Sequence, residues 1–193
     1  MSPSDYCSIR PIHRFWGALF IPTAEFPSLL VSTERLRISP TCDRSRYLEA
    51  MRISHLTLNP HIYVSRPTLN VSPGQILFDV FSRTDGTFVG GLSLLQEEND
   101  DNDVWELGYW ILPEWAGSGL VKEAALSLID ELFVHHHTSK IVIHCDSRNQ
   151  SSIKVAKSLG ANPEAIWSGI DRNTGETIKR LVFVLYKDDS ELL

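Results

Sequence analysis

Cysteine is scarce in this chain, and its few residues lie far apart. The 193 residues include three cysteines, Cys7, Cys42 and Cys145, with no C-x-x-C spacing. An odd and scattered set indicates neither a disulfide framework nor a zinc ribbon. Such cysteine usage is typical of a reducing, intracellular setting, so we expect a cytoplasmic location.

The sequence also lacks a long apolar run. The only candidate targeting feature is the segment 15–21, which follows Arg10 and Arg14 and contains Gly17. It reaches only the lower length limit of a signal-peptide core. A transmembrane helix would need about 20 apolar residues. We therefore expect neither a cleaved leader nor a membrane-spanning segment.

Positive charge is the third scarcity. The chain has 18 Lys and Arg residues against 24 Asp and Glu, which gives a net charge of −6 and a pI near 5.6. No global positive field would attract nucleic acid or anionic lipid, so we expect neither nucleic acid nor a membrane as a partner. A polyanionic ligand would have to be held by a local device.

What the sequence does contain indicates a folded globular protein. Hydrophobic residues make up 42% of the chain and charged residues 22%, which is ordinary for a globular domain. A chain of this length buries about 70% of its unfolded surface and suits one domain better than two. We expect residues 1–30, which carry four prolines, to form an irregular extension, and residues 31–193 to form a single domain.

Hydrophobic periodicity predicts an α/β domain on a mixed, mostly antiparallel sheet. The expected strands cover residues 32–38, 76–83, 87–96, 104–112, 140–145, 165–170 and 178–187. The expected helices are one capped by Thr41 or Asp43 and ended by Pro60, one over 120–135 and one over 151–159. Asp85-Gly86 and Asn173-Thr174-Gly175 predict tight turns, and the segments 59–75 and 97–103 are expected to be loops. One parallel strand pair is expected around the 120–135 helix.

A glycine-containing loop joins the 104–112 strand directly to the amphipathic helix that follows. Such a loop turns successive backbone N–H groups outward at a helix N-terminus and creates an anion site without Lys or Arg. A side chain at Gly117 or Gly119 would keep phosphate oxygens away from the backbone or forbid the required φ. The loop matches neither the Rossmann fingerprint nor a P-loop. Taken alone, it is more often a tight turn without a ligand.

Histidines cluster at 135–137, and His144 with Cys145 follows shortly after. Adjacent histidines on a helix diverge by about 100° and lack the i, i+4 geometry of a helical zinc pair. We read the cluster as a helix C-terminus, where the helix dipole favours a positive imidazolium. No metal is expected.

Several further motifs occur in one order along the chain. They are Thr33-Glu34-Arg35-Leu36-Arg37-Ile38, Glu106-Leu107-Gly108-Tyr109-Trp110-Ile111, Pro113, Ala116-Gly117-Ser118-Gly119, Glu123-Ala124, Asn149-Gln150-Ser151-Ser152 and Leu159-Gly160. Together they resemble the GNAT N-acetyltransferase superfamily, and most closely its Rim-type branch of ribosomal-protein and antibiotic N-acetyltransferases. The resemblance covers about Thr33 to Tyr186 and implies the GNAT fold, a mixed sheet flanked by helices.

The resemblance implies direct, acetyl-CoA-dependent transfer of an acetyl group to a primary amine, without an acyl-enzyme. It assigns the pyrophosphate to backbone N–H groups of Ala116, Gly117, Ser118, Gly119, Leu120 and Val121. It assigns pantetheine contacts to the backbone of Trp110 and Leu112 and to Asn149, which equally suits a helix N-cap. The family's frequent tyrosine acid is replaced by Ala156, so Ser152 is the candidate that hydrogen-bonds the CoA sulfur and stabilises the thiolate. The indoles of Trp110 and Trp115 are expected to flank this cleft.

The 104–112 strand supplies the candidate general base. Alternation places Glu106 on one face with Gly108, which would leave room for the thioester arm, and family members often carry a carboxylate in this strand. A lysine-type amine with a pKa of about 10.4 must first lose a proton, which costs about 4.6 kcal/mol at pH 7. We therefore predict Glu106 as the base, directly or through water. An ordinary half-exposed strand carboxylate is the alternative.

The predicted acceptor is a protein N-terminus or a small-molecule amine, and the acidic balance favours a cationic one. Glu114 departs from the family pattern, which has Gln or Arg at this position. This departure favours, as an alternative, a catalytically inactive GNAT-fold module that binds CoA or has a regulatory role. The sequence does not decide the oligomeric state, and a homodimer is possible.

Overall fold

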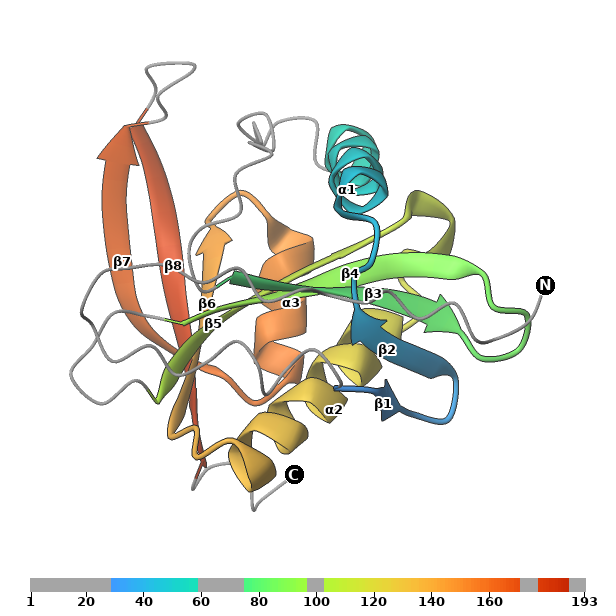
Figure 1. Cartoon of the computed structure of the whole chain (residues 1–193). Coiled ribbons are helices and arrows are strands. Elements are labelled where there is room, and N and C mark those ends of the chain that lie inside the picture. Colours follow the sequence, from blue (N-terminus) through green and yellow to red (C-terminus); the bar gives the residue numbers. More distant parts are fainter. Residues whose placement is uncertain (1–28, 59–74, 97–102, 171–176, 188–193) are drawn as a thin grey trace, which may run out of the picture.

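The computed structural model describes residues 29–58, 75–96, 103–170 and 177–187. Within these residues the centre is an eight-stranded sheet with the order β1-β2-β3-β4-β5-β6-β8-β7 (Figure 1). All neighbouring strands are antiparallel except β5 and β6, which are parallel, so the predicted mixed sheet is confirmed. The strands are β1 (Val31–Ser32), β2 (Leu36–Pro40), β3 (Gln75–Ser82), β4 (Phe88–Gln96), β5 (Val104–Ile111), β6 (Lys140–Asp146), β7 (Asn162–Ile170) and β8 (Thr177–Tyr186).

The helices lie on both faces of the sheet. Those in the described ranges are α1 (Arg44–Leu58), the short 3₁₀ helix η1 (Pro113–Trp115), α2 (Leu120–His135) and α3 (Gln150–Ser158). Figure 1 shows α2 and α3 on one face and α1 on the other. Alternate residues of one strand therefore enter different apolar layers: Leu107 of β5 packs in the layer of α2 and α3, whereas Trp110 packs with Tyr47 of α1.

The predicted helices match those observed to within a residue or two. α1 begins after Asp43, because the Oδ1 atom of Asp43 accepts the N–H of Arg46 at 2.9 Å and caps the helix. α2 covers the same residues as predicted, and its apolar face is buried against the sheet, with Ala125 and Leu128 fully covered. The hairpin between β3 and β4 is also confirmed, with Gly86 at a φ of 73° in its turn.

The first predicted strand, over 32–38, is wrong in its first half. β1 ends at Ser32 and β2 begins only at Leu36, and the chain turns between them. Thr33 closes this turn twice, since its N–H donates to the Leu36 carbonyl at 2.9 Å and its hydroxyl accepts the Leu36 N–H at 2.9 Å. The side chain of Thr33 thus competes with strand pairing, which the alternating pattern does not reveal.

The parallel strands β5 and β6 pair along only part of their length. Their partners are Val104 with Lys140, Trp105 with Ile141 and Glu106 with Val142. Beyond these residues both strands continue, β5 to Ile111 and β6 to Asp146, without pairing to each other. We call this divergence the β5–β6 fork. It brings side chains of two strands together around backbone that has no partner strand on that side among the residues described.

Several predictions fall outside the described residues. These are the irregular extension at 1–28, the loop at 59–74, the acidic tip at 97–102 and the turn at 171–176. No helix in the described part of the chain combines the length and the apolar character needed to cross a membrane.

Candidate active site

The loop before α2 presents backbone N–H groups to open space. Gly117 and Gly119 have φ angles of 75° and 79°, and Gly119 is the N-cap of α2 without any side-chain cap. Within the described ranges, no carbonyl accepts the N–H groups of Gly117, Ser118 or Gly119. A Cβ atom at Gly117 would meet no heavy atom within 4 Å. The loop therefore leaves room beside polar hydrogens that point away from the protein.

Arg35 braces this loop from a distant part of the sequence. Its guanidinium Nε donates to Oε2 of Glu123 at 2.6 Å, and its Nη1 donates to the Ser118 carbonyl at 3.2 Å. Glu123 also accepts hydrogen bonds from the hydroxyl of Thr33 and from the Arg35 N–H. Burial opposes ionisation of Glu123, but these hydrogen bonds outweigh it and lower its pKa. Sequence reasoning missed this contact, because no spacing signal links residues 88 positions apart.

Glu114 lies in η1, next to the loop. Its side chain is exposed to solvent, and Pro113 precedes it at the first turn of η1. An exposed carboxylate is screened by water, which weakens its repulsion of an anion. The departure from the family pattern at this position is therefore compatible with an anion in the glycine loop.

One face of the β5–β6 fork, the face of α1, carries the predicted base. Glu106 is the last residue of β5 that pairs with β6, and its Oε1 atom lies 3.7 Å from Nδ1 of His144. Both side chains are partly exposed, at 33% and 27%. The space that the sequence left beside Gly108 is filled, because a Cβ there would collide with the Ser93 hydroxyl. This hydroxyl is the rotatable end of a side chain, so the expectation of room for a thioester arm above Gly108 stays a prediction.

The opposite face of the fork carries a cluster of hydroxyl and thiol groups. The Ser152 hydroxyl lies 3.1 Å from the Tyr109 hydroxyl and 3.1 Å from the Cys145 sulfur. The Tyr109 hydroxyl donates to the Ser152 carbonyl at 3.0 Å, which fixes its direction. Burial raises the pKa of both Tyr109 and Cys145, so both groups keep their protons. The sequence predicted Ser152 here, but not its two partners.

Asn149 caps α3 and thereby orients Ser152. Its Oδ1 atom accepts the Ser152 N–H at 3.0 Å, which is the N-cap geometry that the sequence offered as one reading. The cap fixes the first turn of α3, so the Ser152 hydroxyl faces the fork. The predicted pantetheine contact of Asn149 stays a prediction.

The Trp110 indole is buried, and the Leu112 backbone is engaged within the protein, while their predicted backbone contacts with pantetheine stay predictions. The Trp110 indole is 7% exposed and packs edge-on against Tyr47, with ring centroids 5.2 Å apart. The Leu112 N–H donates to the Val89 carbonyl at 2.9 Å, and the Leu112 carbonyl accepts the Trp115 N–H at 3.0 Å. The Leu112 N–H is thus turned toward β4 and not toward the fork.

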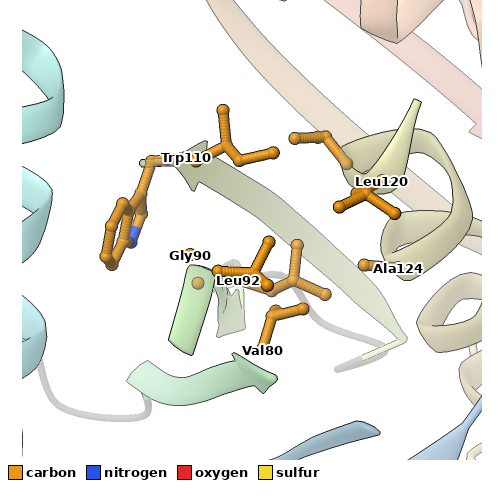
Figure 2. Close-up of a pocket in the computed structure, with 10 residues that line it drawn as sticks. Val80, Gly90, Leu92, Trp110, Leu120 and Ala124 are labelled. Carbon is orange, nitrogen blue, oxygen red and sulfur yellow. The ribbon is translucent and has the colours of Figure 1, made fainter. Parts of the chain in front are cut away.

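A small apolar cavity lies between the first turn of α2 and the sheet. Figure 2 shows Leu120 and Ala124 of the helix facing Val80 and Leu92 of the strands, while the Trp110 indole points away. Its volume is about 10 Å³, enough for about one water molecule. It is a packing void and not a ligand site. The open side of the glycine loop and the fork offer a larger ligand more room than this cavity.

The arrangement just described is a glycine loop at a helix N-terminus beside two diverging parallel strands. A family model for the acetyltransferase (GNAT) domain matches residues 58–162, more than half of the chain. The chain belongs to the GNAT acetyltransferases. This GNAT domain also matches part of the uncharacterized protein YkkB of Bacillus subtilis (strain 168), with 28% identity over 87 residues. The match covers 45% of this chain and only about half, 51%, of YkkB.

Solved structures share the GNAT fold over most of the chain. An acetyltransferase (GNAT family) from Bacillus anthracis has a TM-score of 0.68 at 18% identity, covering 83% of this chain and 99% of that one. The ribosomal-protein-S5-alanine acetyltransferase from Vibrio fischeri has a TM-score of 0.64 at 17% identity, covering 84% and 98%. RimL, a ribosomal L7/L12 alpha-N-protein acetyltransferase in complex with coenzyme A, has a TM-score of 0.65 at 16% identity, covering 83% and 99%. These neighbours show that the chain has the GNAT fold. A putative ribosomal-protein-serine acetyltransferase from Vibrio cholerae, with a TM-score of 0.64 at 26% identity, covering 83% and 98%, agrees with the predicted resemblance to the Rim-type branch.

The acetyl donor of GNAT acetyltransferases is acetyl-CoA, and the glycine loop fits its pyrophosphate. The N–H groups of Gly117, Ser118 and Gly119 have no partner in the described residues, and the space in front of Gly117 would be occupied by any Cβ. The positive end of the α2 dipole adds to the attraction of this loop for an anion. An anion in this loop would be held by backbone groups and would need no Lys or Arg.

Proposed function

We propose that this GNAT acetyltransferase moves the acetyl group of acetyl-CoA directly to a primary amine, either a protein N-terminus or a small-molecule amine. The observation that carries the proposal is the β5–β6 fork, which has an acid–base pair on one face and a hydroxyl cluster on the other. Acetyl-CoA, when bound, supplies an activated acetyl thioester. The chain's own residues have to hold it, deprotonate the amine and stabilise the leaving sulfur.

The glycine loop is proposed to hold the pyrophosphate. The N–H groups from Gly117 to Val121 surround the N-terminus of α2, and Arg35 keeps the loop in place through the Ser118 carbonyl. The prediction for Ala116 is wrong in this structure, because its N–H donates to the Pro113 carbonyl at 3.2 Å and closes η1. From there the pantetheine arm is proposed to run into the fork beside Trp110 and Asn149. Because the Leu112 N–H is bound to Val89, only the carbonyl of Leu112 could be shared with the arm.

Glu106 is proposed to promote the removal of a proton from the amine, directly or through an intervening group. Removing the proton from a lysine-type ammonium costs about 4.6 kcal/mol at pH 7, whereas removing it from an α-ammonium group costs only about 1 kcal/mol. Glu106 lies at the start of the fork and is a third exposed, so an amine can approach it from the face of α1. A base placed here is worth more for a side-chain amine than for an α-amine.

Ser152 is proposed to donate a hydrogen bond to the leaving sulfur. Its hydroxyl lies between the Tyr109 hydroxyl and the Cys145 sulfur, and the Asn149 cap fixes its position. Burial raises the pKa of Tyr109, so Tyr109 keeps its proton. Passing that proton on to Ser152 would therefore be costly. In this structure the Ser152 hydroxyl donates to the Tyr109 hydroxyl, which itself donates to the Ser152 carbonyl. Ser152 is proposed to turn this hydrogen toward the sulfur when acetyl-CoA is bound.

The second candidate function is a CoA-binding or regulatory module without acetyl transfer, which Glu114 favours. Calorimetric titration of acetyl-CoA, followed by thiol release against a panel of amines and peptide N-termini, separates the two. Binding together with amine-dependent thiol release supports the transferase. Binding without thiol release on any amine supports the module, and absence of binding at millimolar acetyl-CoA contradicts both.

A further inference from the structure

Three side chains from three strands meet on the α1 face of the fork. Glu106 comes from β5, His144 from β6 and Trp167 from β7. Nδ1 of His144 lies 3.7 Å from the Glu106 carboxylate, and the imidazole and indole centroids lie 6.4 Å apart with the planes tilted by 35°. The imidazole therefore stands between a carboxylate and an indole at the start of the fork.

The pairing with Glu106 gives the two nitrogens of His144 different roles. A carboxylate favours hydrogen on the nitrogen that faces it, here Nδ1, which leaves the lone pair on Nε2. The same carboxylate stabilises a positive charge that develops on the ring. His144 is 27% exposed, so the ring can be reached from solvent. The other charged side chains of β6 and β8 that the sheet register places on this face are Lys140, Asp146 and Arg180. Asp146 forms an ion pair with Arg148 at 2.8 Å, and Lys140 lies 3.7 Å from Glu164.

Trp167 lies on the outer side of the Glu106–His144 pair. It is 66% exposed on β7, the last strand of the sheet, and the register places it beside Arg180 on the same face as His144. A large indole left in solvent next to the imidazole that faces Glu106 suits an ammonium group on a short apolar stem, because the ring attracts the cation and covers the stem. Its neighbour Ile166 is 67% exposed but lies on the opposite face of β7.

We propose that His144 is a catalytic residue which takes the proton from the acceptor ammonium, and that Trp167 holds the acceptor's stem. The inference rests on the proposed function and deepens it. One N–H bond of the ammonium breaks, its proton moves to Nε2 of His144, and the electron pair stays on the nitrogen as the nucleophilic lone pair. Glu106 balances the imidazolium charge until the proton passes to water. Glu106 then acts on the amine through His144, in place of direct contact.

The test for His144 compares His144→Gln with the matched control His135→Gln, which changes an exposed histidine at the end of α2. The probe is the amine of the panel above with the highest kcat/KM. We expect His144→Gln to lower kcat/KM for that amine about 100-fold at pH 7 and to remove much of the acid limb of the pH–rate profile. The affinity for acetyl-CoA should not change, and His135→Gln should behave like the wild type.

The test for Trp167 compares Trp167→Ala with Ile166→Ala. We expect Trp167→Ala to raise KM for the amine about fivefold or more at an unchanged kcat, with partial rescue in Trp167→Phe. Ile166→Ala should leave both constants unchanged.

The outcomes of the two proposals can be told apart. A His144→Gln enzyme that keeps its kcat/KM and its pH profile overturns the inference and leaves the proposed function intact. Equal effects of Trp167→Ala and Ile166→Ala overturn the role of Trp167. If no amine gives thiol release in the wild type, the proposed function fails, and the inference fails with it.

Discussion

Replacing Gly117 by alanine separates cofactor binding from folding in this protein. Gly117 has a φ of 75°, and a left-handed backbone costs an L-residue about 1–2 kcal/mol. Alanine also has less conformational entropy than glycine in the unfolded chain, which offsets about 0.4–1 kcal/mol of this cost. Gly117→Ala should therefore lower the free energy of unfolding by about 1 kcal/mol. The new methyl also stands in the open space in front of the loop. Loss of one hydrogen bond to a charged phosphate is worth about 1.5–3 kcal/mol, or roughly 10- to 100-fold in Kd.

Gly86 offers a matched control for this experiment. It has a φ of 73° in the β3–β4 turn, and a Cβ there also meets nothing within 4 Å. Gly86→Ala should therefore cost the same stability in urea unfolding. It should leave the calorimetric Kd for CoA unchanged, whereas Gly117→Ala should raise it. Equal Kd values for the two variants would refute the assignment of the glycine loop to the pyrophosphate.

Three further predictions concern the base, the helix cap and the ion pair of a buried carboxylate. Glu106→Gln should lower turnover about 100-fold at pH 7 but much less at about pH 9.5, where amines are partly neutral, and an equal loss in both rate assays would exclude Glu106 as a base. Asn149→Ala should lower the free energy of unfolding by about 1 kcal/mol and Asn149→Ser should restore it, while a raised KM for acetyl-CoA in both would reveal a pantetheine contact beyond the cap. Burial raises the pKa of Asp79, so the stability from this group falls as the pH rises above about 3.9, and Arg46 limits the fall through its 2.7 Å ion pair. Arg46→Met should therefore cost about 1–3 kcal/mol in urea unfolding at pH 8 and less at pH 5, and a pH-independent cost would contradict this reading.

The elements that position the site were predictable from local sequence. The apolar face of α2 and the glycine loop before it are formed by one continuous segment of the sequence. The bounds of the helix therefore follow from hydrophobic periodicity, and the turn follows from the glycines at 117 and 119. The short apolar strand after α2 required a parallel partner, because a helical crossover connects parallel strands. The Asn149 cap was likewise visible in the few residues around it.

The contacts across strands were not predictable in the same way. Glu106 and His144 meet only because β5 and β6 pair in a particular register, and that register is set by the packing of the whole sheet. Arg35 reaches the glycine loop only because Thr33 bends the chain between β1 and β2. The Ser93 hydroxyl beside Gly108 belongs to the neighbouring strand, so alternation along β5 alone suggested an empty space there.

The central claim is that an amine receives the acetyl group directly at the β5–β6 fork. The most direct measurement uses acetyl-CoA labelled in its acetyl carbon and follows, by mass spectrometry of the amine and by thiol titration, where the label goes in the wild type and in Ser152→Ala. The account predicts label on the amine and an equal amount of CoA thiol in the wild type, never label on the protein, and a slower reaction with the same stoichiometry in Ser152→Ala. Label retained on the protein, or CoA thiol released without labelled amine, would contradict it.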